Sequence, residues 1–465
     1  MKSSHNRTPR HGREDGQVLM LFGLFSLVLI LFVGLGIDMG FAYVTKAQLS
    51  KAIDAAGLAA IANYSSADAA KGNPTAIGIA DSTFWANYAT NGVSGRATGA
   101  KKVTPTFVFG QDPVTSNITV TASASTTINT FFLRVLPQWS TLTVGDTAVS
   151  TRSPVVMTLV LDRSGSMAPN AGLGGCDGGT RGGEYLPAAL TEFINIFDET
   201  LDQAAVVTFA TSSSNDVRMT HLFKTGTPSV ITTINRIAGT SSANWLWAGH
   251  TCTMAGLTNA LVIQNSINAP NAIKVVVLFT DGQANTITAT LPNTTPPGGI
   301  TLNFGGNDPI AVGCSGPTPG ASFWRTNLAE TVAIQNGSVL ASVIDGGSAT
   351  FSVGTTSVVT TTQYTDSTGA HLYSAYSITE DATNRCVLLG NQMRTSSNYV
   401  YAVGLSVPGE LAPPTLEQLQ QVANDPASST FDPTLPVGAA FISDGNDLTE
   451  VFQQVASDII LRLVH

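Results

Sequence analysis

Residues 154–167 have the sequence PVVMTLVLDRSGSM, and this stretch decides the fold of the larger part of the chain. Residues 155–161 form an apolar, mostly branched run, which is typical of a strand buried on both faces of a parallel sheet. The run ends in Asp162, and Ser164 and Ser166 follow in a turn. Open α/β sheets bind ligands at the carboxyl ends of their strands, so we expect a binding site at this turn.

A second buried strand is predicted at residues 274–279 (KVVVLF), and it also ends at an acid and a turn, with Asp281 after Thr280. Between the two strands, Thr251 precedes an apolar, helix-like segment at residues 254–267. The pattern predicts a doubly wound, mostly parallel α/β sheet. The acidic and hydroxyl side chains singled out in its loops offer only oxygen donors, which hard divalent cations prefer.

At these residues the chain resembles the von Willebrand factor type A domain, whose metal-ion-dependent adhesion site (MIDAS) combines DxSxS with a Thr and an Asp from two further loops. The resemblance implies five metal ligands, direct or through water: Asp162, Ser164, Ser166, Thr251 and Asp281. Thr253 is close enough to Thr251 to compete for this role. Thr251 is preferred because a Gly-Leu pair, Gly256 and Leu257, begins five residues after it.

The donor set predicts a recognition site for a carboxylate. Three neutral hydroxyls and two carboxylates leave a divalent ion incompletely neutralised, and Mg²⁺ requires six oxygens. We therefore expect Mg²⁺, with Mn²⁺ or Ca²⁺ as alternatives, and a protein partner that supplies an Asp or Glu side chain.

Composition narrows the class of protein. The 465 residues are enough for two or three domains, and 43% of them are apolar. Only 11% are charged, against about 25% in an average soluble domain, which suits an exported protein. The net charge of -9 argues against nucleic acid as a partner.

The four cysteines show no CxxC spacing, so a zinc site is not expected. One hypothesis pairs Cys176 with Cys252, which would tie two metal loops together, and Cys314 with Cys386. The alternative is four buried thiols.

The N-terminal region predicts a membrane anchor. Residues 18–37 contain no charged side chain and are long enough to span about 30 Å of hydrocarbon. A cleaved signal peptide is the alternative, but its apolar run would be shorter. Basic residues before the span favour a cytoplasmic N-terminus and an exported body; they are Lys2, Arg7, Arg10 and Arg13.

The same region resembles the N-terminal segment of the TadE/TadG-like proteins of Flp (Tad) pilus assembly. The matching features are Gly16-Gln17 before the span, DxG at residues 38–40, and the Ala-rich tract IDAAGLAA at residues 53–60. Helical spacing in that tract predicts that the membrane helix continues outward. Met20 and Leu21 occupy the place where a prepilin-like processing site would carry an acid, so we expect a retained anchor.

A small α+β module is predicted next, with a helix at residues 76–89 and alternating strands within 106–109, 117–121, 126–132 and 141–144. The expected domains are a tail at 1–15, the span and helical stalk at 16–63, the module at 64–151, and the type A domain at 152–465. An insertion at about 285–380 interrupts the last of these. It is either a decoration of the domain or a device that shapes partner choice.

The sequence favours binding over catalysis. No GxSxG surrounds the serines, and His250, which adjoins Thr251, is the candidate general base that a hydrolase would need. The resemblances imply an inner-membrane, single-pass bacterial protein of pilus assembly, with its C-terminal body in the periplasm or outside the cell. The alternatives are a cell-surface adhesin for extracellular ligands and a membrane-tethered metallohydrolase.

Overall fold

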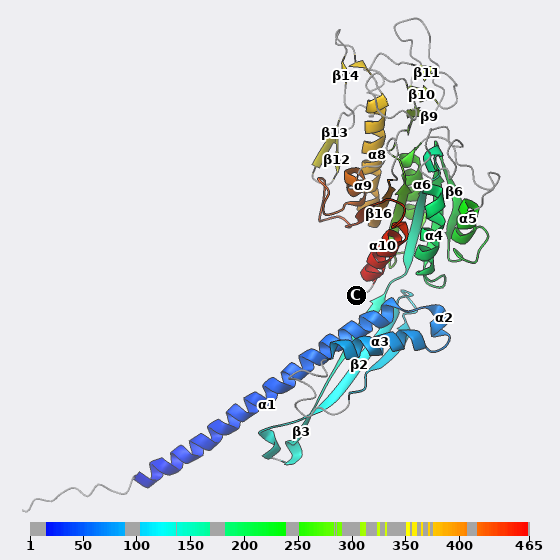
Figure 1. Cartoon of the computed structure of the whole chain (residues 1–465). Coiled ribbons are helices and arrows are strands. Elements are labelled where there is room, and N and C mark those ends of the chain that lie inside the picture. Colours follow the sequence, from blue (N-terminus) through cyan, green and yellow to red (C-terminus); the bar gives the residue numbers. More distant parts are fainter. Residues whose placement is uncertain are drawn as a thin grey trace, which may run out of the picture. The chain divides into compact units, whose positions relative to one another are not determined.

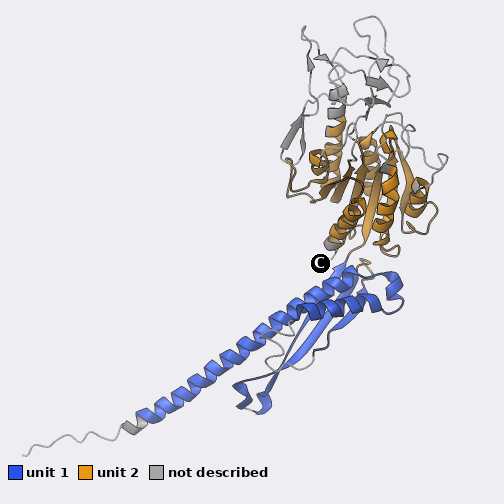
Figure 2. Ribbon diagram, in the orientation of Figure 1, with its two compact units in different colours: residues 1–113, 118–152, 464–465 blue, residues 114–117, 153–463 orange. Residues whose placement is uncertain are grey.

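The computed structural model describes part of the chain and divides it into two compact units. The described residues are 15–88, 103–135, 137–167, 182–238, 251–282, 284, 286–290, 307–312, 323–325, 331–332, 350–353, 356–359, 364–365, 371–372, 375–406 and 416–463. Unit 1 comprises residues 1–113, 118–152 and 464–465, and unit 2 comprises residues 114–117 and 153–463 (Figure 2).

Unit 1 is organised around one long helix, α1 (Asp15–Ala62), which continues past the apolar segment as predicted (Figure 1). Residues 18–33 are exposed, apart from half-buried Ser26, and α1 is long and apolar enough to cross a membrane. Beyond residue 33 one side of the helix is buried. The buried positions recur at helical spacing and include Leu49, Ala52, Ala56 and Ala60.

An antiparallel sheet of order β1-β2-β3 packs on α1; its strands are β1 (Thr106–Gln111), β2 (Ile118–Asn129) and β3 (Thr141–Arg152). The short helices α2 (Ser66–Ala69) and α3 (Pro74–Asn87) precede it, and α3 packs against α1. The sequence predicted separate strands at 117–121 and 126–132. The structure corrects this to the single strand β2, because small residues between them maintain its alternating burial.

Unit 2 contains a six-stranded sheet of order β17-β16-β7-β4-β5-β6. Its strands are β4 (Val155–Asp162), β5 (Gln203–Phe209), β6 (Ser213–Thr220), β7 (Ile273–Thr280), β16 (Asn398–Leu405) and β17 (Ala439–Ser443). All neighbours are parallel except β5 and β6. Every residue of β4 is buried, which confirms the predicted strand buried on both faces.

Helices cover both faces of this sheet (Figure 1). One group contains α4 (Gly182–Asn195), α5 (Val230–Ala238) and α10 (Leu448–Leu463), and the other contains α6 (Thr253–Ser266), α8 (Ala375–Thr395) and α9 (Leu416–Ala423). Leu278 of β7 belongs to the core under α6 and α8, whereas the next residue, Phe279, packs against Phe452 of α10. The fold is therefore the doubly wound, mostly parallel α/β arrangement that the sequence predicts.

The described residues between β7 and α8 include several short strands. A four-stranded sheet has the order β11-β10-β9-β8, formed by β8 (Thr286–Thr290), β9 (Asn307–Val312), β10 (Phe323–Arg325) and β11 (Thr331–Val332). Two antiparallel pairs follow, β12 (Thr350–Val353) with β13 (Thr356–Val359), and β14 (Tyr364–Thr365) with β15 (His371–Leu372). The segment thus enters directly after the carboxyl end of β7.

Candidate functional site

Two adjacent parallel strands bring the predicted acids to the same edge of the sheet. The β4–β7 register pairs Leu161 with Phe279, so the next residues, Asp162 and Thr280, lie beside each other. The Oγ1 of Thr280 donates a hydrogen bond of 2.6 Å to Oδ2 of Asp162. The backbone N–H of Ser164 donates to Oδ1 of the same carboxylate at 2.8 Å. Both oxygens of Asp162 are therefore held in place.

The hydroxyls of the first loop connect this carboxylate to the loop after β7. The Oγ atoms of Ser164 and Ser166 are 3.0 Å apart, and Oγ of Ser166 donates to Oδ1 of Asp281 at 2.8 Å. Four of the five predicted ligands thus form one connected cluster of oxygens.

The fifth predicted ligand, Thr251, lies next to the same loop. A Cβ on Gly282 would lie 3.3 Å from Oγ1 of Thr251 and 3.9 Å from Oγ of Ser166. The competing residue, Thr253, begins α6 and lines a small cavity of about 30 Å³ with residues of β7, α8 and α9. The geometry therefore brings Thr251 to the neighbourhood of Ser166 and Asp281, as the sequence predicts.

The end of β5 holds the first and second loops together. The carbonyl of Phe209 accepts a hydrogen bond from the N–H of Arg163 at 2.8 Å, and the next carbonyl, of Ala210, accepts from the N–H of Cys252 at 2.7 Å. Helix α6 can approach this closely because Gly256 has no side chain. A Cβ there would lie 2.7 Å from Phe209 and 2.8 Å from Val160.

The site is nearly closed to solvent. Asp162 and Asp281 are fully buried, Ser164 and Thr251 are almost fully buried, and Ser166 is half-buried. Burial raises the pKa of Asp162 to about 6, against the opposing effect of hydrogen bonds from Thr280 and Ser164. Two buried carboxylates surrounded by hydroxyls fit a hard divalent cation, which would neutralise them.

No group of three or more His, Cys, Asp or Glu side chains gathers at any point of the described residues. The cluster at β4 and β7 has only two carboxylates, and its other donors are hydroxyls. His250, the residue on which a hydrolase would depend, lies outside the described residues. Hydroxyl and carboxylate oxygens thus define the chemistry of this site.

Thr280 is a residue of the site to which the sequence assigned no role. Its position directly before Asp281 places it near the edge where both strands end, but only the register in the structure shows that it lies beside Asp162. Its hydroxyl orients the carboxylate of Asp162 rather than adding a predicted ligand.

The cysteine pairing stays a prediction. Cys252 and Cys386 are buried, at 0% and 5% exposure. Their hypothetical partners, Cys176 and Cys314, lie outside the described residues.

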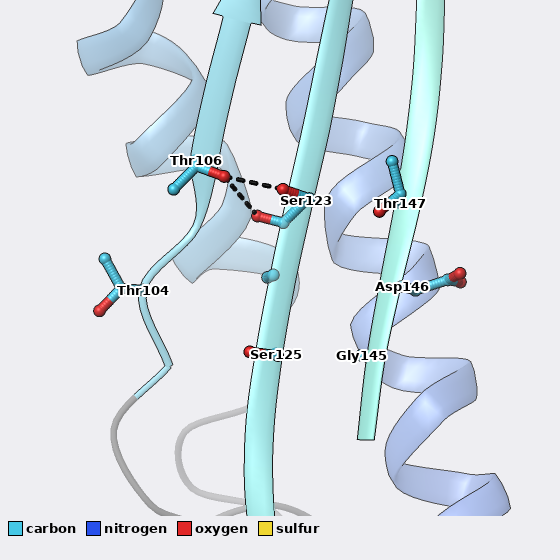
Figure 3. Close-up of a pocket in the computed structure, with 8 residues that line it drawn as sticks. Thr104, Thr106, Ser123, Ser125, Gly145, Asp146 and Thr147 are labelled. Carbon is cyan, nitrogen blue, oxygen red and sulfur yellow. Dashed lines mark hydrogen bonds between the residues drawn. The ribbon is translucent and has the colours of Figure 1, made fainter. Parts of the chain in front are cut away.

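Unit 1 has a different kind of depression, an open groove lined by Thr104, Thr106, Ser123, Ala124, Ser125, Gly145, Asp146 and Thr147 (Figure 3). The Oγ1 of Thr106 and Oγ of Ser123 are 2.7 Å apart. Asp146 accepts a hydrogen bond from Ser50 of α1, and this bond lowers the pKa of its carboxyl. Its carboxylate is therefore engaged with the helix, and the groove offers mainly hydroxyls.

Comparisons with family models agree with the descriptions of unit 1 and of unit 2. The "von Willebrand factor type A domain" family model matches residues 157–283, which run from β4 to the loop after β7. The "Putative Flp pilus-assembly TadE/G-like" family model matches residues 16–70, which cover most of α1 and α2. The fold of unit 2 and the family match define a von Willebrand factor type A domain. The chain combines this domain with a TadE/G-like segment at its N-terminal end.

Solved structures with similarity to the chain include three pilus proteins. The pilus adhesin SpaC from Lactobacillus rhamnosus GG is 13% identical, with a TM-score of 0.40, over 78% of this chain and 35% of SpaC. The PilB minor pilin from Streptococcus sanguinis is 15% identical, with a TM-score of 0.37, over 78% of this chain and 79% of PilB. The adhesive tip pilin GBS104 from Group B Streptococcus agalactiae is 14% identical, with a TM-score of 0.40, over 66% of this chain and 100% of GBS104.

The chain thus spans about a third of the length of SpaC. With TM-scores of 0.37 to 0.40, none of these similarities carries an argument about function. No curated protein matches the chain.

Proposed function

We propose that this protein is a membrane-anchored, Mg²⁺-dependent binding component of Flp/Tad-type pilus assembly. Its type A domain captures an Asp or Glu side chain of a partner protein. The ligands of the ion are Asp162, Ser164, Ser166, Thr251 and Asp281. The observation that carries the proposal is the buried oxygen cluster in which Ser166 links the loops of Asp162 and Asp281.

The residues of the cluster prepare a cation site in two ways. Thr280 and the N–H of Ser164 fix both oxygens of Asp162, so the carboxylate does not have to be reoriented when a cation binds. Burial of Asp162 and Asp281 makes their negative charge costly without a counterion. A bound Mg²⁺ supplies a positive charge with coordination positions left for a further carboxylate oxygen.

The membrane part of the proposal is supported by α1 and by the TadE/G-like match. Residues 18–33 expose apolar side chains around the whole helix, which suits a lipid environment. Basic residues before the span favour a cytoplasmic N-terminus in the bacterial inner membrane, with both the sheet of unit 1 and the type A domain on the outer side.

The test uses the full chain, solubilised in detergent and crosslinked to partners in Mg²⁺ or in EDTA. We expect capture of a pilus-assembly component in Mg²⁺, loss of capture in EDTA, and loss in Asp162→Ala. Glu192→Gln is the matched control, because it removes an exposed carboxylate from α4. Capture that persists in EDTA would overturn the metal-bridged mechanism. Capture of a host or matrix protein in place of a pilus component would support the surface adhesin.

A further inference from the structure

The connection between β2 and β3 has an unusual composition for a hairpin turn. Residues 130–140 have the sequence TFFLRVLPQWS, in which Arg134 is the one charged residue. Four of its apolar side chains are solvent-exposed, Phe131 by 52%, Phe132 by 40%, Val135 by 75% and Trp139 by 52%, whereas Leu133 is half-buried. Turns are normally rich in Gly, Asn, Asp and Ser, and a gathering of exposed apolar side chains marks a contact surface.

The turn is attached to α1 through the carboxylate of Asp38. Oδ1 of Asp38 accepts a hydrogen bond from the N–H of Phe131 at 2.7 Å. Oδ2 accepts hydrogen bonds from the N–H groups of Phe132 at 3.0 Å and Leu133 at 2.8 Å. Asp38 is only 3% exposed. Three backbone donors on one buried carboxylate fix the position of the turn along the helix.

A second contact lies one helical turn closer to the N-terminus. A Cβ on Gly34 would lie 2.6 Å from the Cβ and Cγ of Phe132, so only glycine leaves room for this ring. Gly34 and Asp38 lie on the same side of α1, about 6 Å apart along its axis. Phe132 therefore reaches beyond Asp38 toward the exposed apolar stretch at residues 18–33.

This places the turn at the boundary of the membrane segment. The uncharged run of α1 ends at residue 37, and Asp38 is the first charged residue after it. A helix that spans the membrane with residues 18–37 has Asp38 at the interface and Gly34 inside the outer leaflet. The aromatic side chains beside Asp38 then lie at the depth where Trp and other aromatic residues are enriched in membrane proteins.

We infer that the β2–β3 turn is a second membrane contact of this protein, which inserts Phe132 and Trp139 into the outer-leaflet interface next to α1. Arg134 faces the lipid phosphates from the same turn. The inference rests on the proposed membrane anchor. The partner of the turn is the lipid surface, because the turn continues the apolar surface of α1. By holding one side of the helix, the turn also fixes the rotation of α1 about its own axis relative to the bilayer.

The experiment is bromine quenching of tryptophan fluorescence in the full chain, reconstituted in nanodiscs of phosphatidylethanolamine and phosphatidylglycerol. Discs with acyl chains brominated near the headgroup are compared with unbrominated discs. The chain has five tryptophans. We expect brominated lipid to quench up to about a fifth of the emission, and Trp139→Phe to abolish this quenching. Trp85→Phe, which changes a partly exposed ring on α3, is the matched control and should keep it.

The outcomes separate this inference from the proposed anchor. A protein that stays in the discs while Trp139 is not quenched has its anchor but no lipid contact at the turn, which overturns the inference alone. If Trp139 is shielded from aqueous iodide but not quenched by bromine, a second copy of the chain covers the turn. This outcome would also overturn the inference of a lipid contact. A chain that does not enter the discs would overturn the anchor and this inference together.

Discussion

The Oγ of Ser166 donates a hydrogen bond of 2.8 Å to Oδ1 of Asp281, a residue 115 positions further along the chain. This bond joins the loop after β4 to the loop after β7. It exists because these strands are parallel neighbours whose carboxyl ends meet at one edge of the sheet. A cation between the two loops would therefore find its donors already assembled.

Ser166→Ala should weaken Mg²⁺ binding by about 10- to 100-fold, because it removes one hydroxyl donor and releases the carboxylate of Asp281. Isothermal titration calorimetry of the detergent-solubilised chain measures this change. Ser214→Ala, at an exposed position of β6, is the matched control and should bind as the wild type does. Equal affinities for the two variants would remove Ser166 from the site.

The stability of the cation-free protein should fall as pH rises from about 4 to 6. Burial raises the pKa of Asp162 from 3.8 to about 6, so in this range the folded protein keeps a proton that the unfolded chain has released. Above the pKa of Asp162 in the folded protein, the loss in the free energy of unfolding is complete and amounts to about 3 kcal/mol. Thermal unfolding in EDTA across this range measures it.

Asp162→Asn should flatten this pH dependence, since it removes the titrating carboxyl while keeping its shape.

In the wild type, Mg²⁺ should raise the melting temperature at pH 7.5 and much less at pH 5, where a proton occupies Asp162. An equal rise at both pH values would show that Asp162 does not bind the ion.

Gly256→Ala should destabilise unit 2 by about 1–3 kcal/mol, because its Cβ would overlap Phe209 and Val160 where α6 crosses the sheet. The shift of α6 should also displace Thr251, two residues before this helix begins, and so weaken Mg²⁺ binding. Chemical denaturation and calorimetry measure the two effects. Thr258→Ala, at an exposed position of the same helix, is the control. Wild-type stability of Gly256→Ala would contradict the close packing.

Much of unit 2 could be predicted because each of its strands is specified by a short run of consecutive residues. The run from Val155 to Leu161 is apolar except for Thr158, and such a run forms a strand buried on both faces. Parallel strands that are neighbours end at the same edge of the sheet, so the convergence of Asp162 and Asp281 could be predicted from the sequence. The role of Thr280 depends on the exact register between these strands, which hydrophobic patterning does not encode.

The turn of unit 1 could not be predicted for a different reason. In the sequence Asp38 stands out only as part of a DxG feature, and its hydrogen-bond donors lie 93 to 95 residues away. A contact over that distance leaves no periodic signal in either segment. The sequence predicts that the apolar residues 131–132 end a strand, whereas β2 ends at Asn129.

Asp38→Asn should loosen the β2–β3 turn. An amide has one acceptor oxygen where the carboxylate has two, and its NH₂ group would face backbone donors. Hydrogen bonds to a charged acceptor are worth about 1.5–3 kcal/mol each, so unit 1 should lose stability on this scale. Hydrogen exchange of the amides of residues 131–133 should become faster. Asp54→Asn, at an exposed position of α1, is the control and should leave the exchange unchanged. Unchanged protection in Asp38→Asn would show that the carboxylate does not hold the turn.

The two glycines at positions 34 and 36 offer a matched test of how closely the turn approaches α1. Both lie in the same helix, so replacement by alanine changes intrinsic helix propensity equally. A Cβ on Gly34 would meet Phe132 at 2.6 Å, whereas a Cβ on Gly36 has no atom within 4 Å among the described residues. Gly34→Ala should therefore push Phe132 outward, speed the exchange of the amides bonded to Asp38, and lower the melting temperature in detergent. Gly36→Ala should do none of these, because its Cβ meets nothing. If both variants behave alike, Phe132 does not pack on Gly34, and the turn does not reach the depth in the membrane that its contact with α1 implies.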